Sequence, residues 1–141
     1  MTRIYELLGR LIWISTRPIT SRIMRGSTRS YVLLECGTQV LLVKNWIGSG
    51  KWRLPGGGVN SDETPAEGAA RELYEELSIE IDPDVLTLKT KYSYRARHIH
   101  IFSYQLTAKP EFSRFKPELT SARWCTLTEV ELDGTFGMLH S

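Results

Sequence analysis

The chain has 141 residues, of which 41% are hydrophobic and 24% are charged. This length corresponds to one domain, and the composition is that of an ordinary globular protein, so collagen-like, low-complexity and wholly disordered chains are excluded. Only two cysteines are present, Cys36 and Cys125, which excludes a disulfide framework. We expect two free, buried thiols in a reducing compartment, while a single bridge between them stays open.

The apolar residues near the start of the chain form no segment that is long enough to cross a membrane. The longest runs, residues 7–8 and 11–14, are separated by Gly9 and Arg10. Each run is far shorter than the ~20 residues of a transmembrane helix. They are also too short for the core of a signal peptide. We therefore expect a cytoplasmic protein.

Charge is distributed unevenly along the chain. The formal net charge is +2, but residues 1–30 contain six arginines and a single acidic residue, Glu6. The rest of the chain therefore carries a small excess of acidic residues. A basic start and a mildly acidic body indicate that the two parts have different roles.

The basic stretch also has the apolar pattern of a helix. Its apolar residues recur at helical spacing, and Pro18 ends the pattern. We expect residues 1–28 to form a basic helical segment packed on a domain of residues 29–141. A membrane-surface contact through residues 1–17 and a homodimer contact are the alternatives. The apolar residues are Ile4, Leu7, Leu8 and Leu11.

Two apolar runs joined by a tight turn predict a β-hairpin. Residues 31–36 form the first run, residues 37–38 the turn and residues 40–44 the returning strand. Residues 45–51 contain two glycines and are predicted to form a loop. A short strand is expected at residues 52–54, followed by a proline and three glycines.

The clearest helix is predicted over residues 65–77. Thr64 can cap its N-terminus, Pro65 occupies the first helical position, and Glu67 completes a capping box. One face of this helix is apolar and should pack on the core. The apolar face consists of Ala66, Ala69, Ala70, Leu73 and Leu77.

The second half of the chain is predicted to be mostly extended. Strands that surround one central helix indicate a mixed α/β domain. The extended runs are residues 79–81, 85–94, 98–107 and 123–127; a loop is expected at residues 110–117, and a short helix after Thr128.

Three carboxylates share one face of the predicted helix. Glu72, Glu75 and Glu76 stand at positions i, i+3 and i+4, where like charges repel each other. A hard divalent cation such as Mg²⁺ would neutralise them, because it prefers oxygen ligands. Taken alone, a solvated acidic face is the more common explanation of such a cluster.

The residues before the helix change this interpretation. Residues 54–58 read LPGGG, and glycines let a backbone approach an ion or a phosphate closely. Gly57 is followed by Glu63 and then by RELYEELSI at residues 71–79. This spacing resembles the signature box of the Nudix hydrolases, which cleave a nucleoside diphosphate linked to another group. Eight of the nine defined positions agree, and Ser78 stands where the family usually has glycine.

The resemblance extends over residues 29–130 and implies a fold and an activity. The implied fold is a Nudix-type α/β/α sandwich with a mixed central sheet. The implied activity is Mg²⁺-dependent hydrolysis of a diphosphate linkage, with Mn²⁺ as a substitute metal. The substrate would be a small nucleotide derivative rather than a nucleic acid. A nucleoside triphosphate, ADP-ribose, a nucleotide sugar and a dinucleoside polyphosphate all fit.

The resemblance also implies roles for the residues of the box. The general base would be Glu72, with Glu111 or Glu118 as candidates outside the box. Glu63 would pair with Arg71 and hold the loop to the helix. The metal would be held by Glu72, Glu75, Glu76 and a backbone carbonyl of Gly56 or Gly57.

Substrate-binding residues are expected outside the box. Arginines can grip a phosphate, and tyrosines can stack on a base. A half-buried sheet with alternating polar positions would explain the same pattern. Two nearby histidines, His98 and His100, lack a third ligand for zinc. The candidates are Trp46, Tyr92, Tyr94, Arg95 and Arg97.

Two other functions compete with the hydrolase. One is a non-catalytic Nudix-fold module that binds a nucleotide or a protein partner. The three clustered carboxylates argue against it, because a binding module has no need of them. The other is removal of diphosphate from RNA ends, which would favour a basic surface with interleaved aromatic residues. The basic stretch at residues 1–30 contains few aromatic residues, so this function ranks lowest.

Overall fold

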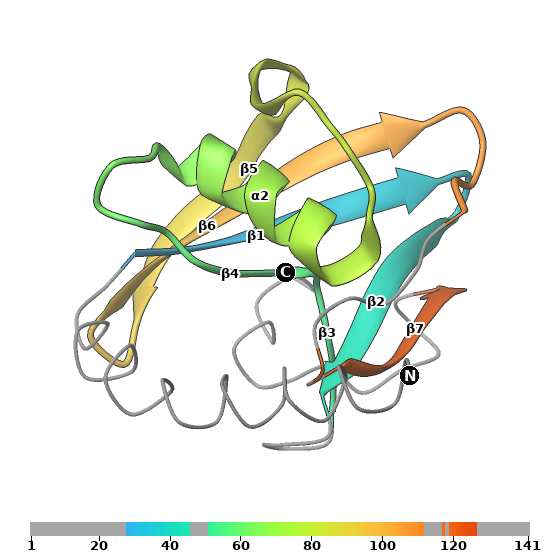
Figure 1. Ribbon diagram of the computed structural model, residues 1–141, viewed down its shortest axis with the longest axis horizontal. Helices are drawn as coiled ribbons and strands as arrows, with labels where there is room; N and C mark the ends of the chain where they lie inside the picture. Colours follow the sequence, from blue (N-terminus) through green and yellow to red (C-terminus); the bar gives the residue numbers. More distant parts are fainter. Residues whose placement is uncertain (1–27, 46–50, 112–116, 118, 127–141) are drawn as a thin grey trace, which may run out of the picture.

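The computed structural model describes residues 28–45, 51–111, 117 and 119–126 (Figure 1). Some predictions concern residues outside these ranges. They are the N-terminal helix with its membrane or dimer contact, the roles of Trp46 and Glu118, and the helix after Thr128. The described elements are β1 (Thr28–Cys36), β2 (Gln39–Asn45), β3 (Trp52–Arg53), β4 (Gly56–Gly58), α2 (Pro65–Leu77), η1 (Pro83–Val85), β5 (Thr87–Tyr94), β6 (Arg97–Leu106) and β7 (Leu119–Cys125).

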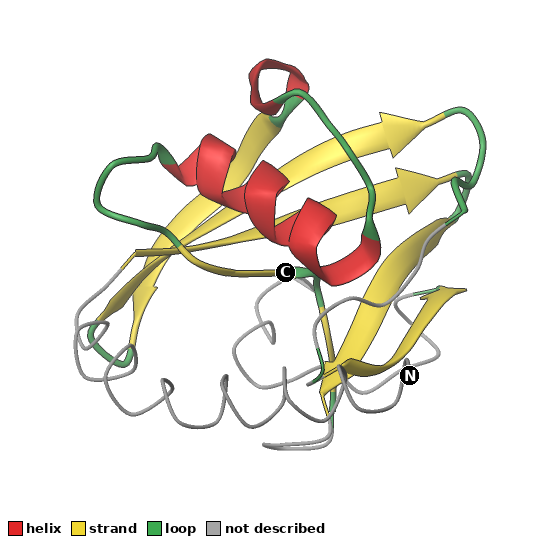
Figure 2. Ribbon diagram, viewed as in Figure 1, coloured by secondary structure: helices red, strands yellow, loops and turns green. Residues whose placement is uncertain are grey.

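The strands form one mixed sheet, and α2 lies across one of its faces (Figure 2). The strand order is β3-β2-β1-β6-β5, with β4 paired to β1 and β7 paired to β2. β1 and β6 run parallel, and the other pairs are antiparallel. The predicted α/β class and mixed sheet are confirmed.

The predicted hairpin is present, but its two strands separate soon after the turn. β1 and β2 are paired at Glu35–Val40 and Cys36–Gln39. Farther from the turn, β1 pairs with β4 and β2 pairs with β3. The segment that contains β3 and β4 therefore closes the opening between β1 and β2. The hydrogen bond from Val32 N to the Pro55 carbonyl, at 2.9 Å, belongs to this closure.

The helix begins and ends where the sequence predicts. The Thr64 hydroxyl accepts a hydrogen bond from Glu67 N at 3.2 Å, and the Glu67 carboxylate accepts one from Thr64 N at 2.7 Å. This reciprocal pair is the predicted capping box. Ala69, Leu73 and Leu77 of its apolar face are fully buried.

The sheet separates two apolar cores because its side chains alternate between the two faces. On β1, Val32 and Leu34 face α2, whereas Tyr31 and Leu33 face the opposite side. The first core fills the space under α2. The second core contains Leu54 and Ile99, with Tyr92 and Tyr94 packed against it.

Several expected boundaries were wrong. The three glycines form strand β4, because residues without side chains can pair with β1 directly beneath the helix. Residues 79–81 are not a strand, and a 3-10 turn at Pro83–Val85 delays β5 until Thr87. Asp82 caps that turn through its side chain, which accepts from Asp84 N at 2.9 Å. The last strand begins at Leu119, earlier than expected.

Two smaller findings concern the cysteines and the membrane. Neither Cys36 nor Cys125 forms a disulfide, but only Cys125 is buried, and Cys36 is partly exposed because it adjoins the hairpin turn. The expected burial of Cys36 was therefore wrong. No helix within the described part of the chain is long and apolar enough to span a membrane.

Ser78 ends α2 in the left-handed conformation, with φ 58° and ψ 24°. This backbone conformation is strained for any residue with a Cβ atom, which explains why glycine is the usual residue at this position of the box. We expect Ser78→Gly to raise the free energy of unfolding by about 0.5–1 kcal/mol. Urea unfolding would measure the change. Ser78→Ala keeps the Cβ atom and should not stabilise, so equal effects of the two variants would contradict this explanation.

Candidate functional site

Two carboxylates of α2 are pressed against the backbone of β4. Glu72 and Glu76 are buried, and Glu76 is only 1% exposed. Gly56 N donates a hydrogen bond to Glu76 Oε2 at 3.1 Å. A Cβ atom added at Gly57 would lie 2.6 Å from Glu72 Oε1, so any other residue there would force the carboxylate to move. A Cβ atom added at Gly56 would instead meet the Ser30 carbonyl of β1 at 2.2 Å. Gly57 therefore leaves the space that the Glu72 carboxylate fills, and Gly56 allows β4 to pair closely with β1.

A guanidinium group from β3 neutralises the more deeply buried carboxylate. Arg53 Nη2 donates to Glu76 Oε1 at 2.7 Å, and the Arg53 side chain is 15% exposed. The same guanidinium donates to the Asn45 side chain at 3.1 Å and to the carbonyls of Leu54 and Gly56 at 2.9 and 3.2 Å. Such bonds are needed because an unpaired buried carboxylate is strongly destabilising.

The predicted pair between Glu63 and Arg71 is present. Arg71 Nε lies 3.2 and 3.1 Å from the two Glu63 oxygens, and Arg71 Nη2 lies 2.7 Å from Oε1. Arg71 Nη2 also donates to the Gly58 carbonyl at 2.8 Å. One guanidinium therefore joins the helix, the loop before it and β4.

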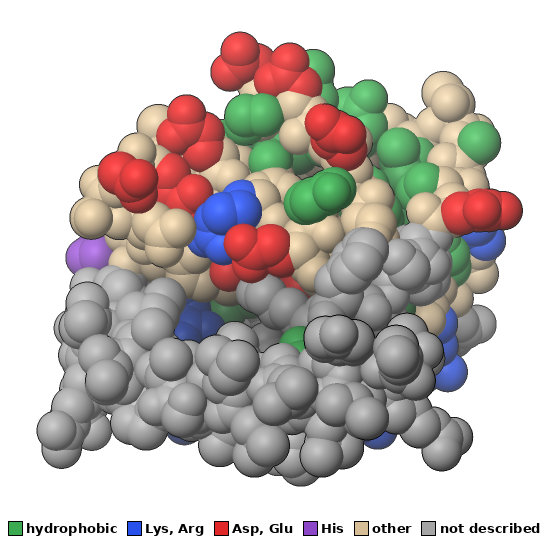
Figure 3. All heavy atoms as spheres, in the orientation of Figure 1, with side chains coloured by type: hydrophobic (Ala, Val, Ile, Leu, Met, Phe, Trp, Pro, Cys, Tyr) green, Lys and Arg blue, Asp and Glu red, His purple; other side chains and the backbone are tan. Residues whose placement is uncertain are grey.

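Arg71 also contacts the other carboxylates of the box. Its Nη1 atom lies 3.1 Å from Glu75 Oε1 and 3.3 Å from Glu72 Oε1. The hydrogen bonds with Glu63, and then the charges of Glu72 and Glu75, hold the pKa of Arg71 well above its usual range. The bonds from Arg71 and, to a smaller extent, from Asn60 N lower the pKa of Glu63. In Figure 3 acidic side chains surround a basic group over α2.

The two arginines offset the repulsion between the clustered carboxylates. Among the described residues, no group of three or more His, Cys, Asp or Glu side chains is already arranged to hold a metal ion. Glu76 instead points at Arg53, and Glu75 at Arg71. The donors still suit a hard cation, because the Gly56 carbonyl and the Glu76 carboxylate accept hydrogen bonds from the same guanidinium and so lie close together.

The predicted substrate-binding cluster is divided between the two faces of the sheet. Tyr92 and Tyr94 share a face, as expected, and pack on the second core. His98 pairs with Ser93, and its Nδ1 atom lies 3.2 Å from the serine hydroxyl, on the other face. Burial, and then the neighbouring Tyr31 and Tyr94, raise the pKa of Tyr92.

The two predicted arginines lie at the far end of this hairpin. Arg95 forms part of the turn between β5 and β6, and its guanidinium lies 5.2 Å from the ring centre of Tyr94. Arg97 is exposed at the first position of β6. Tyr92 is separated from Gly58 by Ile99 and Arg29 along one row of the sheet, which places it about 14 Å from β4.

Sequence reasoning missed two basic residues. Arg53 alternates with Trp52 and Leu54, and this period of two was the available signal that its side chain faces α2. Arg29 lies in the row between β4 and Tyr92, and its buried Nε atom has no hydrogen-bond partner within the described residues. Only strand pairing could have placed Arg29 there.

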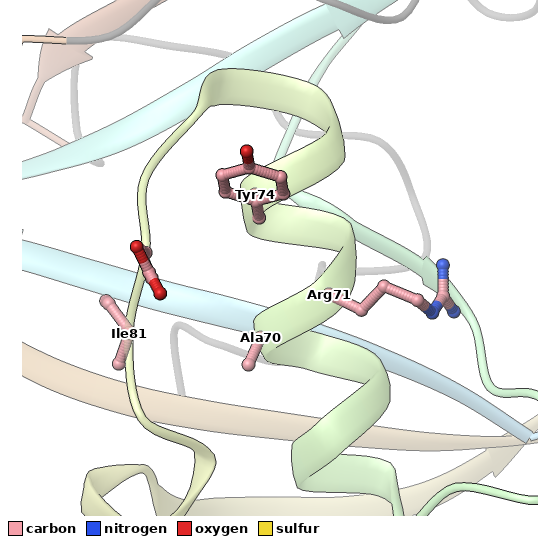
Figure 4. Close-up of a pocket in the computed structure, with 5 residues that line it drawn as sticks. Ala70, Arg71, Tyr74 and Ile81 are labelled. Atoms are coloured by element: carbon pink, nitrogen blue, oxygen red, sulfur yellow. The ribbon is translucent and has the colours of Figure 1, made fainter.

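A shallow hollow of about 300 Å³ lies on the other flank of α2. Figure 4 shows that the Arg71 guanidinium points away from this hollow. It is therefore separate from the carboxylates that face β4. Its lining residues are Ala70, Arg71, Tyr74, Glu80 and Ile81.

Comparison with known proteins identifies the family. A family model described as the NUDIX domain matches residues 24–139. The chain belongs to the Nudix family. A MutT-like protein of Streptomyces ambofaciens is 37% identical over 82 residues, which cover 58% of this chain and 52% of that protein. An 8-oxo-dGTP diphosphatase of Proteus vulgaris is 31% identical over 74 residues, covering 52% of this chain and 61% of that protein.

The fold is shared with solved Nudix structures. The crystal structure of a MutT protein from Methanosarcina mazei matches with a TM-score of 0.61 and 26% identity. That match covers 78% of this chain and 86% of the other chain. This chain matches only about half to three fifths of the length of the two curated relatives, so their whole-protein activities do not transfer to it directly.

The Glu63–Arg71 pair predicts a pH-dependent contribution to stability. Folding lowers the pKa of Glu63. The pair therefore contributes its full stabilisation of the folded protein above the ordinary pKa of a glutamate. That contribution is lost as the pH falls through the lowered pKa of Glu63 in the folded protein. We expect Glu63→Gln to reduce the free energy of unfolding by about 1–3 kcal/mol at pH 7 and by less at pH 3. Urea unfolding at both pH values, with the exposed Glu80→Gln as control, checks this. An equal loss at both pH values would contradict it.

Proposed function

We propose that the chain hydrolyses a diphosphate linkage in a small nucleoside diphosphate derivative, with Mg²⁺ held by the box carboxylates. The observation that carries this proposal is the approach of Glu72 and Glu76 to the backbone of Gly56 and Gly57. Burying two carboxylates opposes folding even when they are paired, so their burial here supports a functional role. Membership of the Nudix family supports the same conclusion.

Three carboxylates and one backbone group would hold the metal. Glu72, Glu75, Glu76 and the carbonyl of Gly56 or Gly57 supply the oxygen donors that Mg²⁺ prefers, and Mn²⁺ accepts the same donors. When bound, the cation would offset the charge of the diphosphate oxygens and lower the pKa of water.

The side chains of the box would also supply the general base and orient the carboxylates. Glu72 is buried next to Gly57 and is our candidate for the general base. Glu111 is exposed on the segment after β6 and is the described alternative outside the box. Arg71 would orient Glu72 and Glu75 through its Nη1 atom while its bonds to Glu63 and Gly58 hold it in place.

The substrate would extend from β4 across the face of the sheet opposite α2. Arg29, Tyr92 and Tyr94 lie on that face, and they offer a charged donor and aromatic rings. The relatives named as a MutT-like protein and an 8-oxo-dGTP diphosphatase favour a nucleoside triphosphate as the first compound to test. ADP-ribose, nucleotide sugars and dinucleoside polyphosphates remain in the same chemical class.

The test is release of phosphate or nucleotide, with Mg²⁺, from a panel of these compounds. Glu75→Gln and Glu76→Gln should each lower kcat by about 100-fold or more on the compound that is turned over. Glu80→Gln removes an exposed carboxylate outside the box and should retain wild-type turnover. Circular dichroism would confirm that each variant is folded.

Two other outcomes would contradict the proposal. Tight binding of one nucleotide without turnover, in a folded protein with Mg²⁺ present, would indicate the non-catalytic binding module. Release of diphosphate from a 5′-triphosphate RNA, but from no small nucleotide, would indicate a nucleic-acid substrate instead.

A further inference from the structure

We propose that Arg53 is a built-in counter-cation of the metal site, a positioning residue that holds the metal ligands in place and competes with the divalent cation for them. This inference rests on the proposed function, because it assumes that Glu76 and Gly56 are metal ligands. It concerns the affinity for metal and the stability of the metal-free protein, so it can be tested without turnover.

The contacts of Arg53 overlap with the proposed ligand set. Of the four acceptors that its guanidinium reaches, the Glu76 carboxylate and the Gly56 carbonyl are both proposed ligands. The other two acceptors, the Asn45 side chain and the Leu54 carbonyl, lie outside that set. A cation bound to Glu76 and Gly56 would therefore stand within a few ångströms of a second positive charge.

Burial makes this competition significant. Glu76 is 1% exposed and Arg53 is 15% exposed, so water screens neither charge well. Without a metal, loss of Arg53 would remove the guanidinium that lies 2.7 Å from the buried Glu76 carboxylate, which strongly opposes folding. With a metal, Arg53 would repel the cation. The same side chain should therefore stabilise the metal-free fold and weaken metal binding.

The position of Arg53 is set by the register of β3. Arg53 pairs with Val43, whose side chain faces α2, whereas Trp52 faces the opposite side. The Trp52 ring lies 4.4 Å from the Arg123 guanidinium and 5.9 Å from the Lys44 ammonium. With Trp52 held on the opposite face, the alternation of the strand directs the Arg53 side chain toward α2 and Glu76.

Arg71 also contacts two proposed ligands, Glu72 and Glu75, through its Nη1 atom at 3.3 and 3.1 Å, but these are not its shortest bonds. Its shortest bonds, to Glu63 and to the Gly58 carbonyl, lie outside the proposed ligand set. The Arg71 side chain is also 28% exposed, so water screens its charge better. Arg71 can keep those bonds when a cation binds, whereas Arg53 must weaken the bond to Glu76 or to Gly56.

The experiment compares wild type, Arg53→Met and Arg53→Lys for thermal unfolding and for Mn²⁺ binding by calorimetry, without substrate. Arg53→Met should lower the Tm of the metal-free protein by roughly 5–10 °C and tighten Mn²⁺ binding by about tenfold. Mn²⁺ should therefore raise its Tm more than that of wild type. Arg53→Lys keeps the charge but not the fork of donors, so its Tm should fall while its Mn²⁺ affinity stays near wild type.

A matched control separates the local effect from net charge. Lys89→Met removes one positive charge from an exposed position on β5, and it should leave both Tm and Mn²⁺ affinity unchanged. A tenfold gain in Mn²⁺ affinity for this variant as well would overturn the inference, because a distant charge would then explain the effect.

A direct measurement on wild type covers the case in which Arg53→Met does not fold. In NMR spectra, the Arg53 Nε–H resonance is identified as the signal that disappears in Arg53→Lys. During titration of wild type with Mg²⁺, this resonance should shift more than the Nε–H resonance of Arg71. No shift at Arg53 with bound metal, or equal Mn²⁺ affinity of wild type and a folded Arg53→Met, would overturn this inference alone. Failure of wild type to bind Mg²⁺ or Mn²⁺ would overturn the proposed function as well.

Discussion

The contact between the carboxylates of α2 and the glycine backbone of β4 constrains the rest of the structure. Glu72 lies close to β4 because Gly57 has no side chain, and Glu76 accepts a hydrogen bond from Gly56 N. Once these carboxylates are removed from water, each needs a positive partner or a hydrogen-bond donor. Arg53, Arg71 and the Gly56 N–H group meet this need. The contact therefore depends on these partners, and the register of β3 places Arg53 among them.

The architecture supplies this contact through the divergence of β1 and β2. The two strands pair next to their turn and then separate, and the segment with β3 and β4 occupies the opening. This brings Arg53 and the glycines together under one flank of α2. The apolar residues of the helix, including Leu73 and Leu77, hold it against the sheet. Core packing therefore fixes the height of the carboxylates above the glycines.

The negative charges of the glutamates in the site are balanced by the positive charges of Arg53 and Arg71. Arg71 ties the loop and the helix together, and the depressed pKa of Glu63 reflects that bond. Arg53 forms an ion pair with Glu76, which is more deeply buried than Glu72. In the proposed metal site, an entering divalent cation would exchange one set of favourable interactions for another. Under the same proposal, Arg53 would set the net metal affinity together with the carboxylates.

The sequence by itself determined the features that depend on near neighbours. The limits of α2 and its capping box depend on residues a few positions apart, so local spacing predicts them. The Glu63–Arg71 pair spans eight positions, and the resemblance to the Nudix box implied it. The Arg53–Glu76 pair joins residues 23 positions apart, and only strand register and helix packing decide it. The division of tyrosines and histidines between two faces likewise required the pairing of β5 with β6. Contacts between residues that are close in sequence follow from the order of those residues, whereas long-range contacts depend on how the strands of the sheet pair.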